Sequence, residues 1–392
     1  MASTTQRAGF RRYIPLQDAE RSRQLATSDT YKWAELRCTE RFVIDWTRHW
    51  ETLANEPYKG ITVDGNVIPN LFHLSSDIEV SAPIEAMKNA AVQLLDTATP
   101  SERTALAKPI HAPEWRHWAN PEIYIYRHGI RLEEVSNELV DAVYDLMRAS
   151  LSPTGYVKAW GCMKVNKFLG EVVNGRKVLN EGSYNFCLFG MPSQDEPWGW
   201  QIFGHHFCMN CMMIKGQMVI SPIFMGAEPN IIDEGPDNGR AFHRPGTARY
   251  EADAVHPADQ RHLGGAFQDN RVIPYEGARV VTLTKEQQDM VKQLLTLSLN
   301  YLPDKALNAR MEEIAAHWED TYFAWIGDFG GKDAFYYKVH SPVVMIEFDH
   351  HSGVFLNNEE AMPFHIHTLV RTPNGNDYGM ELLKQYMQKS AK

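Results

Sequence analysis

The sequence has few cysteines, no long apolar run and no signal-like segment. Its five cysteines in 392 residues are odd in number, which favours free thiols in a reducing compartment over a disulfide framework. No run of about 18 apolar residues occurs, and the first residues lack the apolar core of a signal peptide. We therefore expect a cytoplasmic protein with no membrane partner.

The charge balance is acidic, and common catalytic motifs are missing. The formal net charge is −10, and basic residues gather only in "GFRRY" near the N-terminus. Nucleic acids require a concentrated basic face, so we expect no nucleic-acid partner. The sequence also lacks G-x-G-x-x-G, a P-loop, G-x-S-x-G and H-E-x-x-H, which weighs against nucleotide binding and serine-hydrolase chemistry. A small-molecule substrate is the expected partner, and the oligomeric state stays open, a homo-oligomer included.

Apolar and aromatic residues are plentiful enough for a large core. Hydrophobic residues make up 44% of the chain. Helical spacing of apolar residues dominates residues 31–182, and β-prone aromatic runs dominate 183–372. A helix over 376–390 closes the chain. These patterns predict an α+β fold with a mainly antiparallel sheet from the central and C-terminal segments and helices packed around it. We expect an N-terminal arm over 1–30 and a single domain over 31–390.

Two polar segments give more local expectations. "YKGITVDGNVIPNLFHL" has the pattern of a hairpin that turns at Asp64-Gly65. Residues 229–279 are rich in glycine, proline, aspartate and histidine and show no periodicity. Irregular segments of this length are usually functional loops, so we expect this one to lie near the site.

Histidines carry the strongest functional signal. His365 and His367 stand two apart in "FHIHT", and Glu347 and Asp349 have the same spacing in "IEFDHH". Residues i and i+2 of a strand share a face, with Cβ atoms roughly 6.5–7 Å apart. Two imidazoles at that spacing can bind one metal ion, and a carboxylate can complete the site, orient a ligand or act as a general base.

A second pair of histidines, His205 and His206, lies in "GHHFCMN". On a regular strand these two side chains point to opposite faces, so only one of them joins the His365–His367 pair, unless Gly204 marks a bulge. Asn210 shares the face of His206, which favours His206, but a slip of register reverses the choice.

Other candidates have equally ordinary structural explanations. Cys208 and Cys211 form a C-x-x-C, yet positions three apart on a strand face opposite ways, which favours core packing over metal or redox chemistry. The indole rings of Trp200 and Trp325 could line a substrate pocket with Asn210, or simply pack in the core. Arg371 could bind a substrate carboxylate through its planar fork, or form a salt bridge.

Several motifs together resemble the DUF3500 family. They are "LSPTGYVKAWG", "PWGWQIFGHHF", "FAWIGD", "YYKVHSPVVMIEFDHH" and "FHIHTLVRTPNGNDYGMELL", in that order. The resemblance covers roughly residues 30 to 390 and implies one shared architecture, but no reaction. Family members usually carry "GHHLSLN" where this chain has "GHHFCMN", so the histidines match and Cys208 does not. The resemblance also covers His365, His367 and the "EFD" of Glu347 and Asp349. Members often have Asp where this chain has Thr372.

Three functions remain in competition. The first is a metal-dependent enzyme that acts on a small organic molecule, with zinc favoured and a hydrolytic or lyase reaction preferred. The second is an iron- or copper-dependent oxygenase or oxidase of secondary metabolism. The third is a metal-free enzyme with a histidine general base, or a small-molecule binding protein whose histidines are structural.

Overall fold

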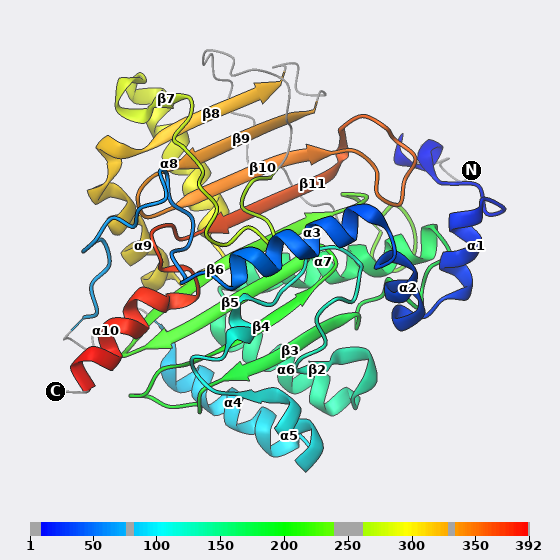
Figure 1. The fold of residues 1–392 in the computed structure, drawn as a ribbon, viewed down its shortest axis with the longest axis horizontal. Helices are drawn as coiled ribbons and strands as arrows, with labels where there is room; N and C mark the ends of the chain where they lie inside the picture. Colours follow the sequence, from blue (N-terminus) through cyan, green and yellow to red (C-terminus); the bar gives the residue numbers. More distant parts are fainter. Residues whose placement is uncertain (1–8, 76–81, 239–261, 328–333, 391–392) are drawn as a thin grey trace, which may run out of the picture.

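The computed structural model of the protein is built on one 11-stranded sheet (Figure 1). The structure describes residues 9–75, 82–238, 262–327 and 334–390. The strands are β1 (Ala107–Lys108), β2 (Ile130–Arg131), β3 (Tyr184–Phe189), β4 (Trp198–Gly204), β5 (Phe207–Ile214), β6 (Gln217–Ala227), β7 (Ala278–Arg279), β8 (Tyr322–Gly327), β9 (Phe335–His340), β10 (Met345–His351) and β11 (Met362–Arg371).

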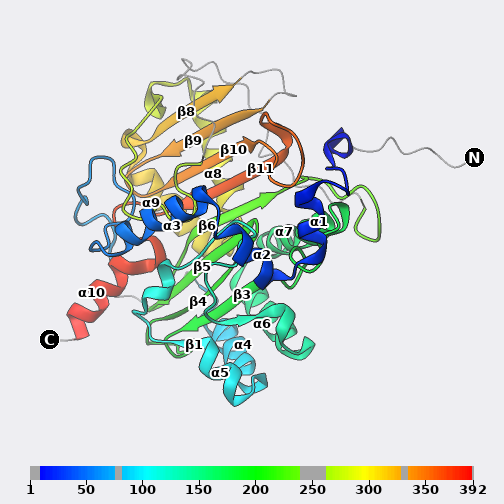
Figure 2. The ribbon, with the colours of Figure 1, turned by 45° about the vertical axis from the view of Figure 1, so that its right-hand side comes forward.

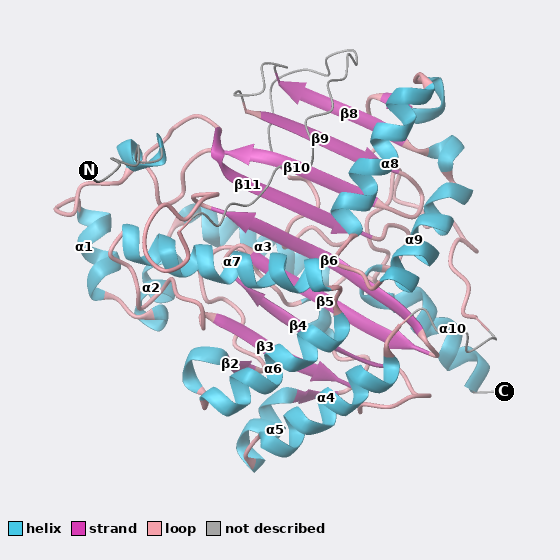
Figure 3. Ribbon diagram, turned by 180° about the vertical axis from the view of Figure 1, so that it is seen from behind, coloured by secondary structure: helices cyan, strands magenta, loops and turns pink. Residues whose placement is uncertain are grey.

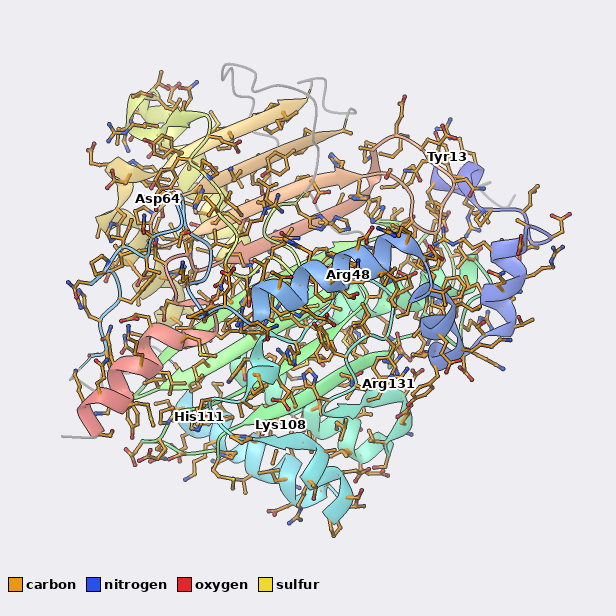
Figure 4. The ribbon with its side chains drawn as sticks, in the orientation of Figure 1. Tyr13, Arg48, Asp64, Lys108, His111 and Arg131 are labelled. Atoms are coloured by element: carbon orange, nitrogen blue, oxygen red, sulfur yellow. The ribbon has the colours of Figure 1, made fainter. Side chains whose placement is uncertain are left out.

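Two runs of antiparallel strands, β3 to β6 and β8 to β11, form most of this sheet. They join through the antiparallel pair β6–β11, which gives the strand order β1-β3-β4-β5-β6-β11-β10-β9-β8-β7. The short β2 pairs with β3, where Arg131 (labelled in Figure 4) donates a hydrogen bond to the Asn185 side chain. Between the named strands, only the β1–β3 pair is parallel. The expected mainly antiparallel α+β fold is confirmed.

Helices cover both faces of the sheet. They are α1 (Glu20–Thr27), α2 (Thr30–Arg37), α3 (Arg41–Ala54), α4 (Ile84–Thr97), α5 (Pro100–Leu106), α6 (Asn137–Ser150), α7 (Pro153–Val172), α8 (Lys285–Leu299), α9 (Asp304–Ala316) and α10 (Met380–Ser390). Helix α3 lies in front of the sheet in Figure 1, whereas α6 to α9 lie on the opposite face in Figure 3. Helices α1 and α2 lie beside one end of the strands (Figure 2).

Local signals explain where two of the covering helices begin. Helix α7 starts at Pro153, whose missing N–H has no helical partner to lose, and the Ser152 side chain accepts a hydrogen bond from the backbone N–H of Gly155. Helix α8 starts after Thr284, which forms a capping box with Gln287. Both starts depend on residues adjacent in the chain.

Other expectations need correction or stay partly outside the described residues. The hairpin expected around Asp64 is absent from residues 58–74 as described: Thr62 makes an isolated parallel bridge with Val272 instead. Asp64 forms a local turn by accepting a hydrogen bond from the backbone N–H of Asn66. Between 229 and 279, the described residues are irregular apart from β7 and the two bridge residues Ile231 and Val272, and 239–261 lie outside the described residues.

The described part of the expected N-terminal arm packs against the rest of the chain. The Phe10 side chain is buried in the main hydrophobic core, and the Tyr13 ring contacts the Phe364 ring with centroids 5.4 Å apart. The expected boundary at residue 30 stays a prediction. Among the described helices, none combines the length and the apolar character that crossing a membrane requires.

Candidate metal centre

Strands β10 and β11 place a set of ionisable side chains on one face of the sheet. Asp349 pairs directly with His367, and Glu347 pairs with Leu369. Because side chains alternate along a strand, His365 lies on the same face as His367. The register between the strands shifts after His350: the partner of His350 is Ile366 and that of His351 is Met362, so β11 carries extra residues that include His365. Such a bulge redirects the strand and its side chains.

The "GHH" segment forms a turn, which corrects the expectation that both histidines lie on a strand. Gly204 pairs with Phe207, so His205 and His206 are the two residues of the β4–β5 turn. His206 has φ 60°, a left-handed conformation that is costly for a residue with a side chain. Its N–H donates to the carbonyl of Asn120, and its carbonyl accepts from the N–H of Gly226. These bonds hold the turn against the sheet.

Gly226 lies on β6, between the β4–β5 turn and β11. Because it has no side chain, the turn can approach β11 across β6. It pairs with His367 in the β6–β11 ladder. A Cβ added at this position would lie 2.8 Å from Cδ2 of His367 and 3.0 Å from Cδ2 of His206. Such distances are far below ordinary van der Waals contact, so the two imidazoles meet over the space that a side chain would occupy.

The Nε2 atoms of three histidines converge at this point. The Nε2–Nε2 distances are 3.2 Å for His206–His365, 3.1 Å for His365–His367 and 3.3 Å for His206–His367. All three residues are buried. The expectation that His365 and His367 share a side and are faced by one of the "GHH" pair is therefore confirmed, with His206 as the facing residue.

Hydrogen bonds at the other ring nitrogens fix two of the tautomers. Nδ1 of His365 lies 2.6 Å from the carbonyl oxygen of Ser352, which can only accept, so this nitrogen carries the proton. Nδ1 of His367 lies 3.2 and 3.3 Å from the two carboxylate oxygens of Asp349. The Nε2 atoms of both neutral rings then present lone pairs to one another, and a cation between them would remove that repulsion.

The charge states suit metal ligation. Burial, reinforced by the neighbouring histidines, holds the pKa of His206 and of His365 well below the ordinary value of 6.5. Burial also lowers the pKa of His367 to about 4, against the opposing effect of Asp349. Burial alone would raise the pKa of Asp349, but His367 and His262 outweigh it and keep that pKa well below its usual value. The site therefore offers neutral imidazoles beside one carboxylate.

A buried glutamate, Glu228, holds the segment that contacts His365. The sequence patterns did not single this residue out. Glu228 follows β6, is fully buried, and accepts hydrogen bonds from the backbone N–H groups of Val354, Phe355 and Leu356. These bonds hold the segment that begins at Ser352. Burial raises the pKa of Glu228 to about 7 in spite of the three N–H donors. The "AEP" at the end of the strand has no distinctive spacing, so only the structure reveals this contact.

The described end of the long irregular segment lies against the same face. The carboxylate of Glu347 accepts hydrogen bonds from the N–H groups of Leu263 and Gly264 and from the Tyr336 hydroxyl. This anchors His262, whose Nδ1 lies 3.5 Å from Oδ1 of Asp349. His262 was not among the sequence candidates, because the pattern "ADQRHLGG" gives no fixed spacing to the other histidines.

Arg371, expected to bind a substrate carboxylate, is buried in a protein ion-pair network. Its Nη1 lies 3.0 Å from Oδ1 of Asp269 and 3.1 Å from Oδ2 of Asp377. Its Nε donates to the carbonyl of Gly264 at 2.7 Å. The guanidinium thus holds together the C-terminal segment and the loop that carries His262. A substrate role for Arg371 stays a prediction.

The remaining candidates contribute no atom to the three-histidine group. The His205 ring stacks on that of His206, with centroids 4.0 Å apart, but its nitrogen points elsewhere. His205 is in contact with Asn166 of α7 through Nδ1, at 2.8 Å. Trp200 is on β4 and Trp325 on β8, and each strand is separated from β11 by two others. Their indole N–H groups donate to the Ser150 hydroxyl and the Gly327 carbonyl, respectively.

Two further β5 side chains also have protein partners. Asn210 accepts from the Gln201 amide and donates to the carbonyl of Pro222. Cys208 donates to the carbonyl of Ala119 at 3.3 Å, and neither Cys208 nor Cys211 belongs to a potential metal-binding group among the described residues.

The trio fits a tetrahedral metal ion. Bonds of about 2.0–2.1 Å at tetrahedral angles place neighbouring nitrogens roughly 3.3–3.4 Å apart. The observed separations of 3.1 to 3.3 Å match this spacing. Glu347 is held by the loop instead, and Asp349 faces the Nδ1 side of His367, so neither carboxylate forms part of the trio.

The fold and this cluster define an α+β protein with a buried histidine group that could hold a metal ion. A family model described as "Protein of unknown function (DUF3500)" matches residues 80–380, which is most of the chain. The chain therefore belongs to the DUF3500 family. Comparisons with curated proteins and with solved structures gave no match.

Proposed function

We propose that the protein is a metal-dependent enzyme that acts on a small organic molecule, with His206, His365 and His367 as metal ligands. The observation that carries this proposal is the convergence of three Nε2 atoms within 3.1–3.3 Å of one another. Two of these rings direct their protonated Nδ1 away from the centre. Without a cation, this arrangement forces lone pairs together in a buried setting, which is unfavourable.

Zinc and a hydrolytic or lyase reaction suit the ligand set best. Three histidines with a fourth position left for water or substrate are the set found in zinc enzymes such as carbonic anhydrase. A zinc ion held in this way supplies an activated water at neutral pH. Non-haem iron oxygenases typically use two histidines and one carboxylate. Here the nearest carboxylate, Asp349, contacts the far nitrogen of His367 instead.

The surrounding residues would position the ligands and carry part of the charge. Asp349 holds the proton on Nδ1 of His367 and offsets one positive charge of a divalent ion. The Ser352 carbonyl holds the His365 ring, and Glu228 fixes the segment that follows Ser352. Burial of these groups excludes bulk water and so strengthens every electrostatic interaction at the centre.

Metal analysis of the purified full chain tests the proposal. The protein is prepared without a nickel column, stripped with a chelator, dialysed against Zn²⁺ and assayed for metal by mass spectrometry. We expect at least one bound ion per chain in the wild type. His206→Gln, His365→Gln and His367→Gln should each lose it, whereas His205→Gln, a matched change in the same turn, should retain it.

Turnover is tested on the same preparations. A panel of ester, amide, lactone and hydroxy-acid substrates should reveal an activity that the chelator removes and that Zn²⁺ restores. A wild-type chain that binds no transition metal would overturn the proposal. Activity that survives complete metal removal would favour the histidine general-base alternative.

A further inference from the structure

A second group of potential metal ligands lies on the Nδ1 side of the His367 ring, opposite the Nε2 atom that faces the first group. His367 therefore belongs to both groups. His367, Asp349 and His262 each offer one potential ligand atom, and these atoms lie within 4.8 Å of one another. His367 Nδ1 is 3.2 Å, and His262 Nδ1 3.5 Å, from Oδ1 of Asp349. The first group uses Nε2 of His367, so the two nitrogens of one ring face two different ligand sets.

The second group contains buried polar atoms without a hydrogen bond. Oδ1 of Asp349 and Nδ1 of His262 are both buried and neither makes a hydrogen bond of acceptable geometry. Asp349 is fully buried. Buried polar atoms are nearly always hydrogen-bonded, so two that face each other without a bond require an explanation. A cation coordinated by both atoms would satisfy them together.

We propose that the protein binds a second divalent metal ion between His262, Asp349 and Nδ1 of His367, so that the His367 ring bridges two ions. This inference rests on the proposed metal site of His206, His365 and His367. The ligand set of two nitrogens and one carboxylate oxygen suits zinc, and it is also the set that non-haem iron enzymes use. The observed separations of 3.2 and 3.5 Å are close to the roughly 3.3–3.4 Å between ligands of a tetrahedral ion.

Binding of the second ion requires one proton to leave the His367 ring. A bridging ring must lose the Nδ1 proton that Asp349 accepts in the mononuclear form. The second ion takes the place of that proton, which leaves to solvent, and no electron is transferred. The bridging imidazolate and Asp349 together supply two negative charges to the pair of ions, which a buried dinuclear centre requires.

The placement of His262 distinguishes this second site from the first. The first group is buried throughout, whereas the His262 side chain is 21% exposed. His262 also belongs to a loop that is fastened to the sheet by Glu347 and Arg371. The second ion would thus be held by one ligand on each of two sheet strands and one on a loop, which makes it the more readily exchanged of the two.

Metal stoichiometry tests the inference on the intact chain. Chelator-stripped protein is equilibrated with Zn²⁺ by dialysis, and the bound metal is counted. We expect two ions per chain in the wild type and one in His262→Gln. His351→Gln is the matched control: its ring is 6.1 Å from that of His262 and 5.2 Å from that of His367, yet it belongs to neither ligand group. This control should keep two ions.

The outcomes separate this inference from the proposed function. One ion in the wild type that His365→Gln removes would overturn the second site and leave the first intact. Two ions in His262→Gln would also overturn it, because His262 would then be a partner of Asp349 only. No bound ion in the wild type would overturn both proposals.

Electron paramagnetic resonance of the Cu²⁺-loaded chain tests the bridge itself. Two Cu²⁺ ions joined by one imidazolate couple antiferromagnetically, so the integrated signal at two equivalents should fall well below two spins per chain. His262→Gln with one equivalent should show the full signal of one spin. Two uncoupled spins in the wild type would contradict a bridging role for His367.

Discussion

Asp349 and His367 stand directly opposite each other on β10 and β11, and Nδ1 of the imidazole is hydrogen-bonded to Oδ2 of the carboxylate at 3.3 Å. The carboxylate fixes which nitrogen carries the proton and makes the other nitrogen a better ligand. Asp349→Asn keeps the size of the side chain and an accepting oxygen but removes the charge. We expect zinc to bind the three-histidine site about 10- to 100-fold more weakly in this variant.

Competition with a fluorescent chelator measures that change. Asp45→Asn serves as the control, because Asp45 is in an exposed ion pair with Arg41 on α3 and the change also removes one negative charge. Unchanged zinc affinity in Asp349→Asn would show that Asp349 neither orients His367 nor offsets the charge of the ion.

Gly226 provides the second prediction. Its φ lies outside the left-handed region that disfavours side chains, so alanine meets no backbone penalty there. The added methyl would, however, collide with both His206 and His367. Gly226→Ala should therefore spread the histidines apart and abolish tight zinc binding. Gly9→Ala is the matched control, because the nearest atom to its new Cβ is Nη2 of Arg12 at 3.5 Å.

The zinc content of the two glycine variants tests this prediction, and circular dichroism verifies that both are folded. A folded Gly226→Ala protein that binds zinc as tightly as the wild type would mean that the two rings do not approach each other over this residue.

The sequence alone predicted the parts of this site that depend on strand periodicity. The two-residue spacing of His365 and His367, repeated by Glu347 and Asp349, was enough to place these side chains on one face. It could not assign different roles to the two carboxylates. Glu347 accepts hydrogen bonds from a loop and Asp349 contacts the His367 ring, because of segments distant in the chain.

His206, which the sequence favoured without excluding His205, is the residue that faces His365 and His367, but the reasoning from strand alternation was wrong. The two residues form a turn, where alternation does not apply. The left-handed conformation of His206 is fixed by Asn120 and Gly226, which are remote in sequence. His262 and Glu228 were missed for the same reason, since long-range contacts alone bring them to the site. The prediction of a hairpin at Asp64 was wrong, because a turn motif does not ensure that the segments on either side of it pair as strands.

The ion pairs of Arg371 give a third prediction, which concerns stability. Arg371→Met removes the cation between Asp269 and Asp377, both of which are buried. Losing one partner of a buried ion pair typically costs about 3–5 kcal/mol of unfolding free energy. Arg148→Met is the control: Arg148 and Asp145 have exposed side chains, and such a pair contributes about 0–1 kcal/mol.

Urea denaturation of chelator-treated protein measures both changes. A midpoint for Arg371→Met equal to that of the wild type would contradict the structural role of this network. That result would favour the alternative expectation that Arg371 binds a substrate carboxylate.

The last prediction concerns pH and a histidine outside the three-histidine group. Nε2 of His128 lies 2.8 Å from Oε1 of Gln201, and burial lowers the pKa of His128 to about 4 in spite of this hydrogen bond. The ordinary pKa is 6.5. Between these two values the unfolded chain binds a proton that the folded chain does not, so His128 makes stability fall as the pH decreases from about 6.5 to about 4.

His128→Gln isolates this contribution, because glutamine can still donate to Gln201 but does not titrate. Urea unfolding of both proteins at pH 7 and pH 5, with chelator present, gives the difference in unfolding free energy at each pH. We expect the wild type to lose stability relative to the variant at pH 5, by up to about 2 kcal/mol from the pKa difference. Other titrating groups cancel in this comparison. An equal difference at the two pH values would mean that His128 is protonated in the folded protein as readily as in the unfolded chain.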